Sequence, residues 1–183
     1  EQMLARDSSP ATVAFALPLL RRIAEATEGT ERELIDAGVL ANALRKAGRV
    51  EEAEALQRDL IQRCAAEGNY RLASAIAGDL LNLLRATGRF EAALAVAEEM
   101  AAHTRAAGLG PWTQLANETY RLQVLAAMGK YDEVLAEVER LRPQLASLPP
   151  ESDAEETVVP WNVREALLNT GLQAAVYSGR WEA

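Results

Sequence analysis

The chain has 183 residues, of which 49% are hydrophobic and 25% are charged, and its formal net charge is −8. A single cysteine and a single histidine exclude an internal disulfide and a zinc site of the usual Cys/His kind. The acidic balance argues against nucleic acid as a partner, and no apolar run is long enough to span a membrane. The 36 alanines, with only 5% aromatic residues, favour helices throughout the chain.

The first predicted element covers residues 11–28. Ser9 and Pro10 before it form a typical helix start, because an N-cap side chain is followed by proline at the first helical position. Pro18 lies inside this segment and is expected to kink it. No basic targeting segment precedes the apolar residues, which favours a cytoplasmic location.

A repeat begins after this helix and occurs four times. Each copy ends in a glycine followed by a basic, a large apolar and an acidic residue, and the spacings between these glycines are 40, 41 and 50. A period of about 40 residues predicts a solenoid of helical hairpins. The four aligned segments are Glu33–Gly48, Ala73–Gly88, Gln114–Gly129 and Arg164–Gly179.

In each hairpin the first helix is expected to end at the glycine, which accepts the left-handed backbone conformation that closes a helix. A second helix then starts at once, with acidic residues in its first turn (Glu51–Ala66, Glu91–Ala107, Asp132–Ser147). We therefore expect one array over residues 1–183, made of the second helix of a partial hairpin (11–28), hairpins at 31–67, 70–107 and 112–147, an acidic, proline-rich loop at 148–159 and a truncated hairpin at 160–183. The last five residues read as the opening of a further helix, as if the chain were cut from a longer polypeptide.

These segments resemble tetratricopeptide (TPR) repeats. The resemblance rests on the G-[RK]-[VFYW]-[ED]-[EA]-[AV] turn and on leucines seven or four residues before the glycine, such as Leu81, Leu122 and Leu125. The 40-residue period is similar to that of the long-helix variety found in kinesin light chains and in the sensor arrays of bacterial signalling ATPases. The resemblance implies an all-α, right-handed α-α superhelix in which the first helices line a groove that binds peptides without catalysis.

Candidate groove residues follow from that resemblance and from helix geometry. Six residues before each glycine stands an amide, whose donors and acceptor could hold an extended peptide backbone. Three residues before it stand Arg45 and Arg85, which would favour an acidic ligand, and ten residues before the last glycine stands Asn169. The amides are Asn42, Asn82, Gln123 and Gln173.

Plainer interpretations exist for the same residues. The amides could be ordinary surface residues, and the two arginines could only cap helix ends through the dipole. Trp112 and Trp161 are expected to pack against the preceding hairpin rather than to form a ligand cage, and Cys64 to be a small core residue. His103 lacks a nucleophilic partner nearby, so we expect no catalytic, cofactor or metal site.

The function predicted from the sequence is a non-catalytic scaffold that binds a protein or peptide segment, as a sensor or adaptor part of a larger bacterial protein. The alternative is a structural spacer or a self-association module, with a homodimer formed through exposed solenoid ends.

Overall fold

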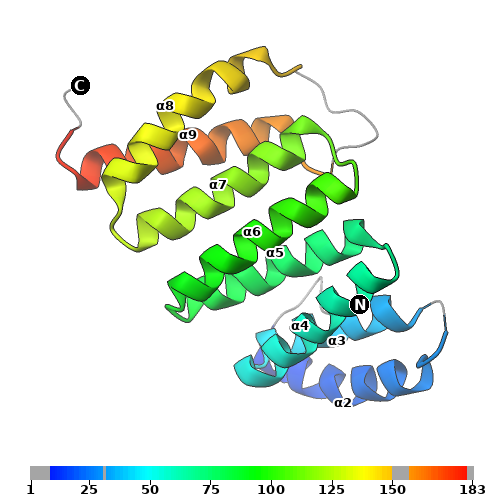
Figure 1. Ribbon diagram of the computed structural model, residues 1–183. Helices are drawn as coiled ribbons and strands as arrows, with labels where there is room; N and C mark the ends of the chain where they lie inside the picture. The colour runs from blue at the N-terminus through cyan, green and yellow to red at the C-terminus, as the bar shows by residue number, and fades with distance from the viewer. Residues whose placement is uncertain (1–8, 31, 150–156, 181–183) are drawn as a thin grey trace. The chain divides into compact units, whose positions relative to one another are not determined.

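The computed structural model describes residues 9–30, 32–149 and 157–180, which are almost entirely helical (Figure 1). No strand occurs among them. The eight helices in these ranges are α2 (Pro10–Ala26), α3 (Glu33–Lys46), α4 (Val50–Ala66), α5 (Tyr70–Ala86), α6 (Phe90–Ala106), α7 (Pro111–Ala127), α8 (Tyr131–Ser147) and α9 (Pro160–Tyr177). The all-α prediction is confirmed.

The chain divides into two compact units, Glu1–Leu83 and Leu84–Ala183. The first holds α2, α3, α4 and most of α5, and the second holds the last turn of α5 and the helices α6 to α9. Within the first unit α3 packs against both α2 and α4, and within the second α7 packs against α6, α8 and α9. Consecutive helices therefore form sequential hairpins in each unit.

The turns inside the hairpins close in the way that their glycines predict. Gly88 has a φ of 74°, in the left-handed region that favours glycine. The N–H of Arg89 then donates to the carbonyl of Leu84 at 2.9 Å, which satisfies one of the last free carbonyls of α5. The following helix, α6, starts directly at Phe90, so the turn leaves no linker between the two helices.

The second helices bury the same repeat positions. Five, nine and twelve residues after the glycine, the side chains are buried in α4, α6 and α8, and α2 buries the matching positions. Cys64 is likewise fully buried, as expected for a core residue, and the ring of Phe90 is half-buried. The buried positions are Ala53, Gln57 and Leu60 in α4, Ala93, Ala97 and Met100 in α6, Val134, Val138 and Leu141 in α8, and Val13, Leu17 and Leu20 in α2.

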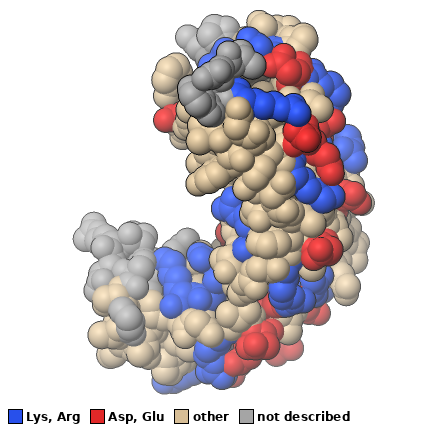
Figure 2. Space-filling view, turned by 90° about the vertical axis from the view of Figure 1, so that its left-hand side faces the viewer, with Lys and Arg blue, Asp and Glu red and all other residues tan. Residues whose placement is uncertain are grey.

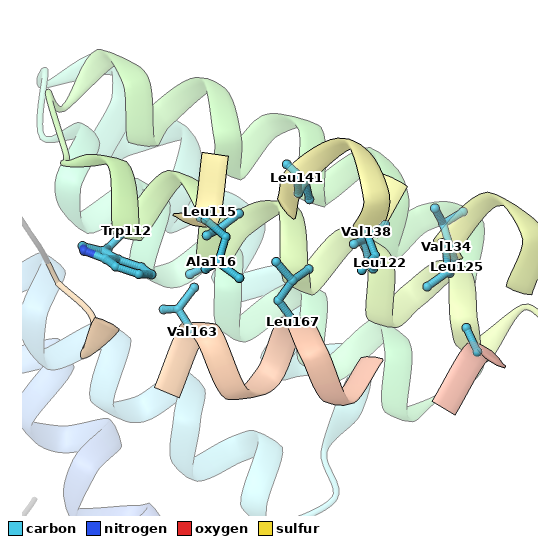
Figure 3. Close-up of a cluster of buried hydrophobic side chains, with 12 residues drawn as sticks. Trp112, Leu115, Ala116, Leu122, Leu125, Val134, Val138, Leu141, Val163 and Leu167 are labelled. Atoms are coloured by element: carbon cyan, nitrogen blue, oxygen red, sulfur yellow. The ribbon is translucent and has the colours of Figure 1, made fainter. Parts of the chain in front are cut away.

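The core of the second unit lies between α7, α8 and α9 (Figure 3). Leu115 and Leu122 from α7 meet Leu141 from α8 and Leu167 from α9, and none of these side chains is more than 1% exposed. Gly171 lets α9 approach α8 closely, since a Cβ at this position would lie 3.2 Å from Cγ1 of Val138.

Candidate peptide-binding surface

The four predicted amides lie on the first helices of the hairpins, two in each unit. Asn42 on α3 and Asn82 on α5 belong to the first unit, and both are half-buried. Gln123 on α7 and Gln173 on α9 belong to the second unit, where Gln123 is half-buried and Gln173 is exposed. Asn169, one helical turn before Gln173, is also exposed. Each unit therefore presents a pair of amides from successive first helices.

The two arginines contact amide oxygens. Within α3, Nη2 of Arg45 donates to Oδ1 of Asn42 at 2.9 Å. In the second unit, Nη1 of Arg85 donates across to Oε1 of Gln123 at 2.7 Å, which joins the end of α5 to α7. A guanidinium has donors only, so the amide atom that it meets must be the oxygen. The NH₂ groups of Asn42 and Gln123 are therefore turned away from the arginines, as donors.

This arrangement makes the surface rich in donors. An amide alone could bind both the N–H and the C=O of a peptide, but the oxygens of Asn42 and Gln123 already accept from arginines. A ligand here would meet guanidinium and amide N–H groups and would need to supply carbonyl or carboxylate oxygens.

One carboxylate opposes this positive character in the first unit. The pKa of Asp79 on α5 lies above its usual range, because the surrounding protein limits hydration of the carboxylate even though part of the side chain is exposed; attraction to Arg45 opposes this shift. Asp79 lies three residues before Asn82, so its charge bears on the same part of the helix.

A pocket of about 390 Å³ lies beside Gln123, between α7 and the start of α9. Its walls are mainly small or apolar, and Thr119 uses its hydroxyl to donate to the carbonyl of Leu115 at 2.9 Å. The rest of the wall comes from residues 157–159, which precede α9. The lining residues are Ala116, Thr119, Tyr120, Gln123, Thr157, Val158, Val159, Asn162, Val163 and Ala166.

The first turn of α7 anchors this wall. Nε1 of Trp112 donates to the carbonyl of Pro149 at 2.9 Å, and the N–H of Thr157 donates to Oγ1 of Thr113 at 3.0 Å. Trp112 is fully buried, with the guanidinium of Arg164 5.4 Å from its ring centre. Trp112 is thus a packing residue, as predicted. The same prediction is wrong for Trp161, whose side chain is 69% exposed.

Solved structures with a similar arrangement of helices are TPR-like arrays. One is the crystal structure of nearly identical TPR-like repeats of a kinesin light chain-like protein from Podosopora anserina, with a TM-score of 0.73 and 20% sequence identity over 99% of this chain and 86% of that one. A point variant of that protein gives a TM-score of 0.74 at 21% identity, over 99% and 85% of the two chains. The present chain has the TPR-like repeat fold.

The resemblance to kinesin light chain-like repeats is therefore confirmed as a structural match over nearly the whole TPR-like array. At these identities the match shows the fold and carries nothing about ligands. No protein-family model matches the sequence, and no curated protein matches it.

Two side chains that could serve in catalysis, Cys64 and Glu118, are buried and ion-paired, respectively. Burial raises the pKa of the Cys64 thiol, which keeps it protonated and unreactive. Glu118 lies on the face of α7 opposite Gln123, where it pairs with Arg121 at 3.1 Å. In the described ranges no three His, Cys, Asp or Glu side chains gather as metal ligands, and none of the helices there has the length and apolarity that crossing a bilayer requires.

The sequence did not reveal the Arg85–Gln123 contact or the pocket wall at residues 157–159. The sequence indicates only the position of Arg85, because its partner on the next first helix depends on how the helices pack. The two valines at 158 and 159 were a usable signal, since an apolar pair after an acidic, proline-rich stretch marks the point where the chain returns to the protein surface.

Proposed function

We propose that this TPR-like array is a non-catalytic scaffold that binds an extended protein segment along its first helices. The observation that carries this proposal is the hydrogen bond from Arg85 to Gln123, because it holds a cation and an amide N–H group side by side on neighbouring first helices. The expected ligand is a segment with exposed backbone carbonyls and acidic side chains. The pocket next to Gln123 gives room for one of its apolar side chains.

Binding of this kind is expected to depend on salt. Arg85 is half-buried, and its guanidinium would steer an acidic segment and fix its direction. Raising the ionic strength screens that attraction and should reduce the association rate more than the dissociation rate.

A peptide array probed with the purified chain tests the proposal. Ligands found with the wild type are titrated against Arg85→Ala, Gln123→Ala and the double variant Asn82→Ala/Gln123→Ala. We expect each single change to weaken binding about ten-fold, the effect of losing one charged or well-placed hydrogen bond. Arg105→Ala is the matched control, because Arg105 is an exposed arginine on α6 that lies near Glu118, on the face of α7 away from Gln123.

Two results would count against the groove. If the double variant leaves every specific interaction unchanged, the amides do not bind the ligand. If Arg105→Ala weakens binding as much as Arg85→Ala, the attraction is a general effect of net charge.

We also propose the biological setting that suits such a scaffold: a sensor or adaptor segment of a larger, cytoplasmic bacterial protein, with any catalytic activity in a domain outside this chain. The full-length gene tests this, since a neighbouring signalling or enzyme domain is expected. A spacer or self-association role is the second candidate, and it is favoured by exposed apolar side chains on α2 and α9, among them Leu19 and Leu172.

A further inference from the structure

A second pocket lies on the face of α7 away from Gln123. It has a volume of about 110 Å³ and lies between α6, α7 and α8, all within the second unit. Each helix turns one face towards the pocket, since its lining residues recur at intervals of three or four positions. We call it the α7 pocket, and it is separate from the peptide-binding surface proposed above.

Asn117 forms the floor of the α7 pocket and is 6% exposed. Its Nδ2 donates to Oγ1 of Thr104 on α6 at 2.6 Å, so the amide oxygen is the end turned away from Thr104. Within the described ranges this oxygen accepts no hydrogen bond, and the pocket leaves it accessible. A buried acceptor that opens into a pocket is a group on which a ligand can gain a hydrogen bond.

The amide of Asn117 is not a requirement of the repeat. At the same position, twelve residues before the glycine, α5 and α9 carry Ile76 and Leu167, which are both buried. On α3 the equivalent residue is Asp36, whose carboxylate pairs with Arg32 at 3.1 Å. Of these four helices, only α7 places an uncharged polar side chain there, and its oxygen is left open.

Two further side chains of α7 add oxygen atoms beside Asn117. Gln114 uses its Nε2 to donate to the carbonyl of Leu109 at 2.9 Å, so its Oε1 is the end left for a ligand. Glu118 accepts from Nε of Arg121 at 3.1 Å through one oxygen only. Gln114, Asn117 and Glu118 line the pocket, and we call them the acceptor wall. Such a group of oxygens suits an ammonium group, which has donors only.

The walls from α6 and α8 offer donors instead. Arg105, in the last turn of α6, forms no ion pair within the described ranges. Arg140 on α8 gives Nε and Nη2 to one oxygen of Glu137, at 3.1 and 2.9 Å, which leaves its Nη1 for another acceptor. Both arginines line the pocket, and we call them the donor wall. Guanidinium groups of this kind suit a carboxylate.

The size of the α7 pocket limits the ligand to a small molecule. An apolar cavity of about 150 Å³ accepts benzene, so 110 Å³ has room for about five or six non-hydrogen atoms. Glycine and alanine are of this size. Leu141, which is 1% exposed, and the half-buried Ala101 also line the pocket and offer contacts to a methyl group.

We propose that the α7 pocket binds a small free α-amino acid as its zwitterion, with the ammonium group on the acceptor wall and the carboxylate on the donor wall. A purely anionic ligand would meet the carboxylate of Glu118, and a purely cationic ligand would meet two guanidinium groups. Opposite charges on one molecule satisfy both walls. Alanine is the expected ligand, because its methyl group contacts Leu141 and Ala101. So small a ligand makes few contacts, and we expect a dissociation constant of about 1 mM.

Titration of alanine into the ¹⁵N-labelled chain, followed by NMR, tests the proposal. The largest shifts are expected for the side-chain NH₂ groups of Gln114, Asn117 and Gln144, which all line the pocket. N-acetylalanine lacks the ammonium group and alanine amide lacks the carboxylate, so each should bind about ten-fold more weakly. Phenylalanine should not bind, because its ring exceeds the space available.

Two variants each remove one charge from the pocket, and neither residue is buried, so the helices should remain, as circular dichroism checks. Arg105→Ala should weaken alanine binding about ten-fold and reduce the preference for alanine over alanine amide. Glu118→Gln should reduce the preference for alanine over N-acetylalanine. Arg142→Ala is the matched control, because Arg142 is an exposed arginine on α8 that does not line the pocket. Gln123→Ala should also bind alanine like the wild type, since Gln123 belongs to the other face of α7.

Other results overturn the proposal. The absence of shifts at alanine concentrations well above the expected dissociation constant excludes the site. N-acetylalanine binding as tightly as alanine would make the pocket an anion site, and alanine amide binding as tightly would make it a cation site. Equal binding by Arg105→Ala and Arg142→Ala would show that alanine binds elsewhere on the chain.

Discussion

Gln57 puts a side-chain amide where the other second helices carry apolar groups. It is 1% exposed, and within the described ranges its Oε1 accepts no hydrogen bond. The equivalent residues are Ala97 on α6 and Val138 on α8, both buried. A buried acceptor without a donor costs free energy, because it has given up water and gained nothing in return.

Replacing Gln57 with leucine should therefore raise the free energy of unfolding by about 1 kcal/mol, a part of the cost of the unsatisfied amide. Urea unfolding of Gln57→Leu against the wild type measures the change. Gln62→Leu, an exposed glutamine on the same helix, is the control and should change little. A loss of stability in Gln57→Leu would show that the amide makes a hydrogen bond that outweighs the apolar packing.

Asp79 predicts a pH dependence. Its pKa is raised in the folded state, so the folded chain binds this proton more tightly than the unfolded chain does. The ionised carboxylate therefore destabilises the fold at neutral pH, and the penalty disappears as the pH falls through the raised pKa. Asp79→Asn should be more stable than the wild type at neutral pH, with a difference that shrinks towards acid pH.

Thermal unfolding from neutral pH to pH 4 checks this expectation for Asp79→Asn. Glu98→Gln, an exposed acid on α6, controls for the loss of one negative charge. A difference between Asp79→Asn and the wild type that grows as the pH falls would contradict the raised pKa.

At this scale the sequence located residues better than it located their partners. Arg45 and Arg85 were open to two interpretations, a helix cap or a ligand contact, and neither foresaw hydrogen bonds to Asn42 and Gln123. Trp161 follows a proline at a helix start as Trp112 does, yet only Trp112 is buried. Such outcomes depend on the distance between helices, which no single position encodes.

At the scale of helices, the same repeat position is buried to different extents in different hairpins, so its side chain contributes differently to stability. Leu122 on α7 is fully buried by α8 and the neighbouring core residues, whereas Leu172 on α9 is 62% exposed. The side chain and its place in the repeat are identical. The difference lies only in what covers it.

This pair gives a direct prediction for packing. Leu122→Ala should cost about 2–5 kcal/mol of stability, because it leaves a cavity in a filled core. Leu172→Ala should change the free energy of unfolding by no more than about 0.5 kcal/mol, as expected for a surface position. Chemical denaturation at a protein concentration below the micromolar range measures both. Equal costs would mean that Leu172 is covered in the chain as it exists in solution.

Helix bounds were the best-predicted feature. The expected second helices Glu51–Ala66, Glu91–Ala107 and Asp132–Ser147 each start one residue after α4, α6 and α8 do. They were readable because glycine at a positive φ ends one helix and leaves no linker before the next. Pro18 was expected to kink its helix, and α2 continues through it to Ala26.

For the molecule as a whole, the division into two units sets how it should unfold. Repeat arrays are stabilised by each repeat and by contacts between neighbours, so destabilising one unit need not unfold the other at once. All three tryptophans, at 112, 161 and 181, belong to the second unit, while helix content reports on both.

Leu122→Ala should therefore shift the transition seen by tryptophan fluorescence to lower denaturant more than the transition seen by circular dichroism. In the wild type the two curves should lie closer together. Coincident curves in the variant would show that the units unfold as one cooperative block.

The net charge of −8 describes the whole molecule poorly. On the face shown in Figure 2, acidic and basic side chains lie beside one another, in keeping with ion pairs such as Arg58–Glu54 at 3.0 Å. The sequence segment 150–156 alone contains four acidic residues. The proposed preference of Arg45 and Arg85 for an acidic ligand therefore does not conflict with the total.

The anchors at the start of α7 also have a practical consequence. Trp112 binds the carbonyl of Pro149, and its neighbour Thr113 binds the N–H of Thr157, so the two ends of the intervening segment are held side by side. Closing a longer loop between fixed ends costs only about 0.6 kcal/mol for each doubling of its length. This point of the chain should therefore accept an inserted epitope or a small reporter domain with the register of α7, α8 and α9 unchanged.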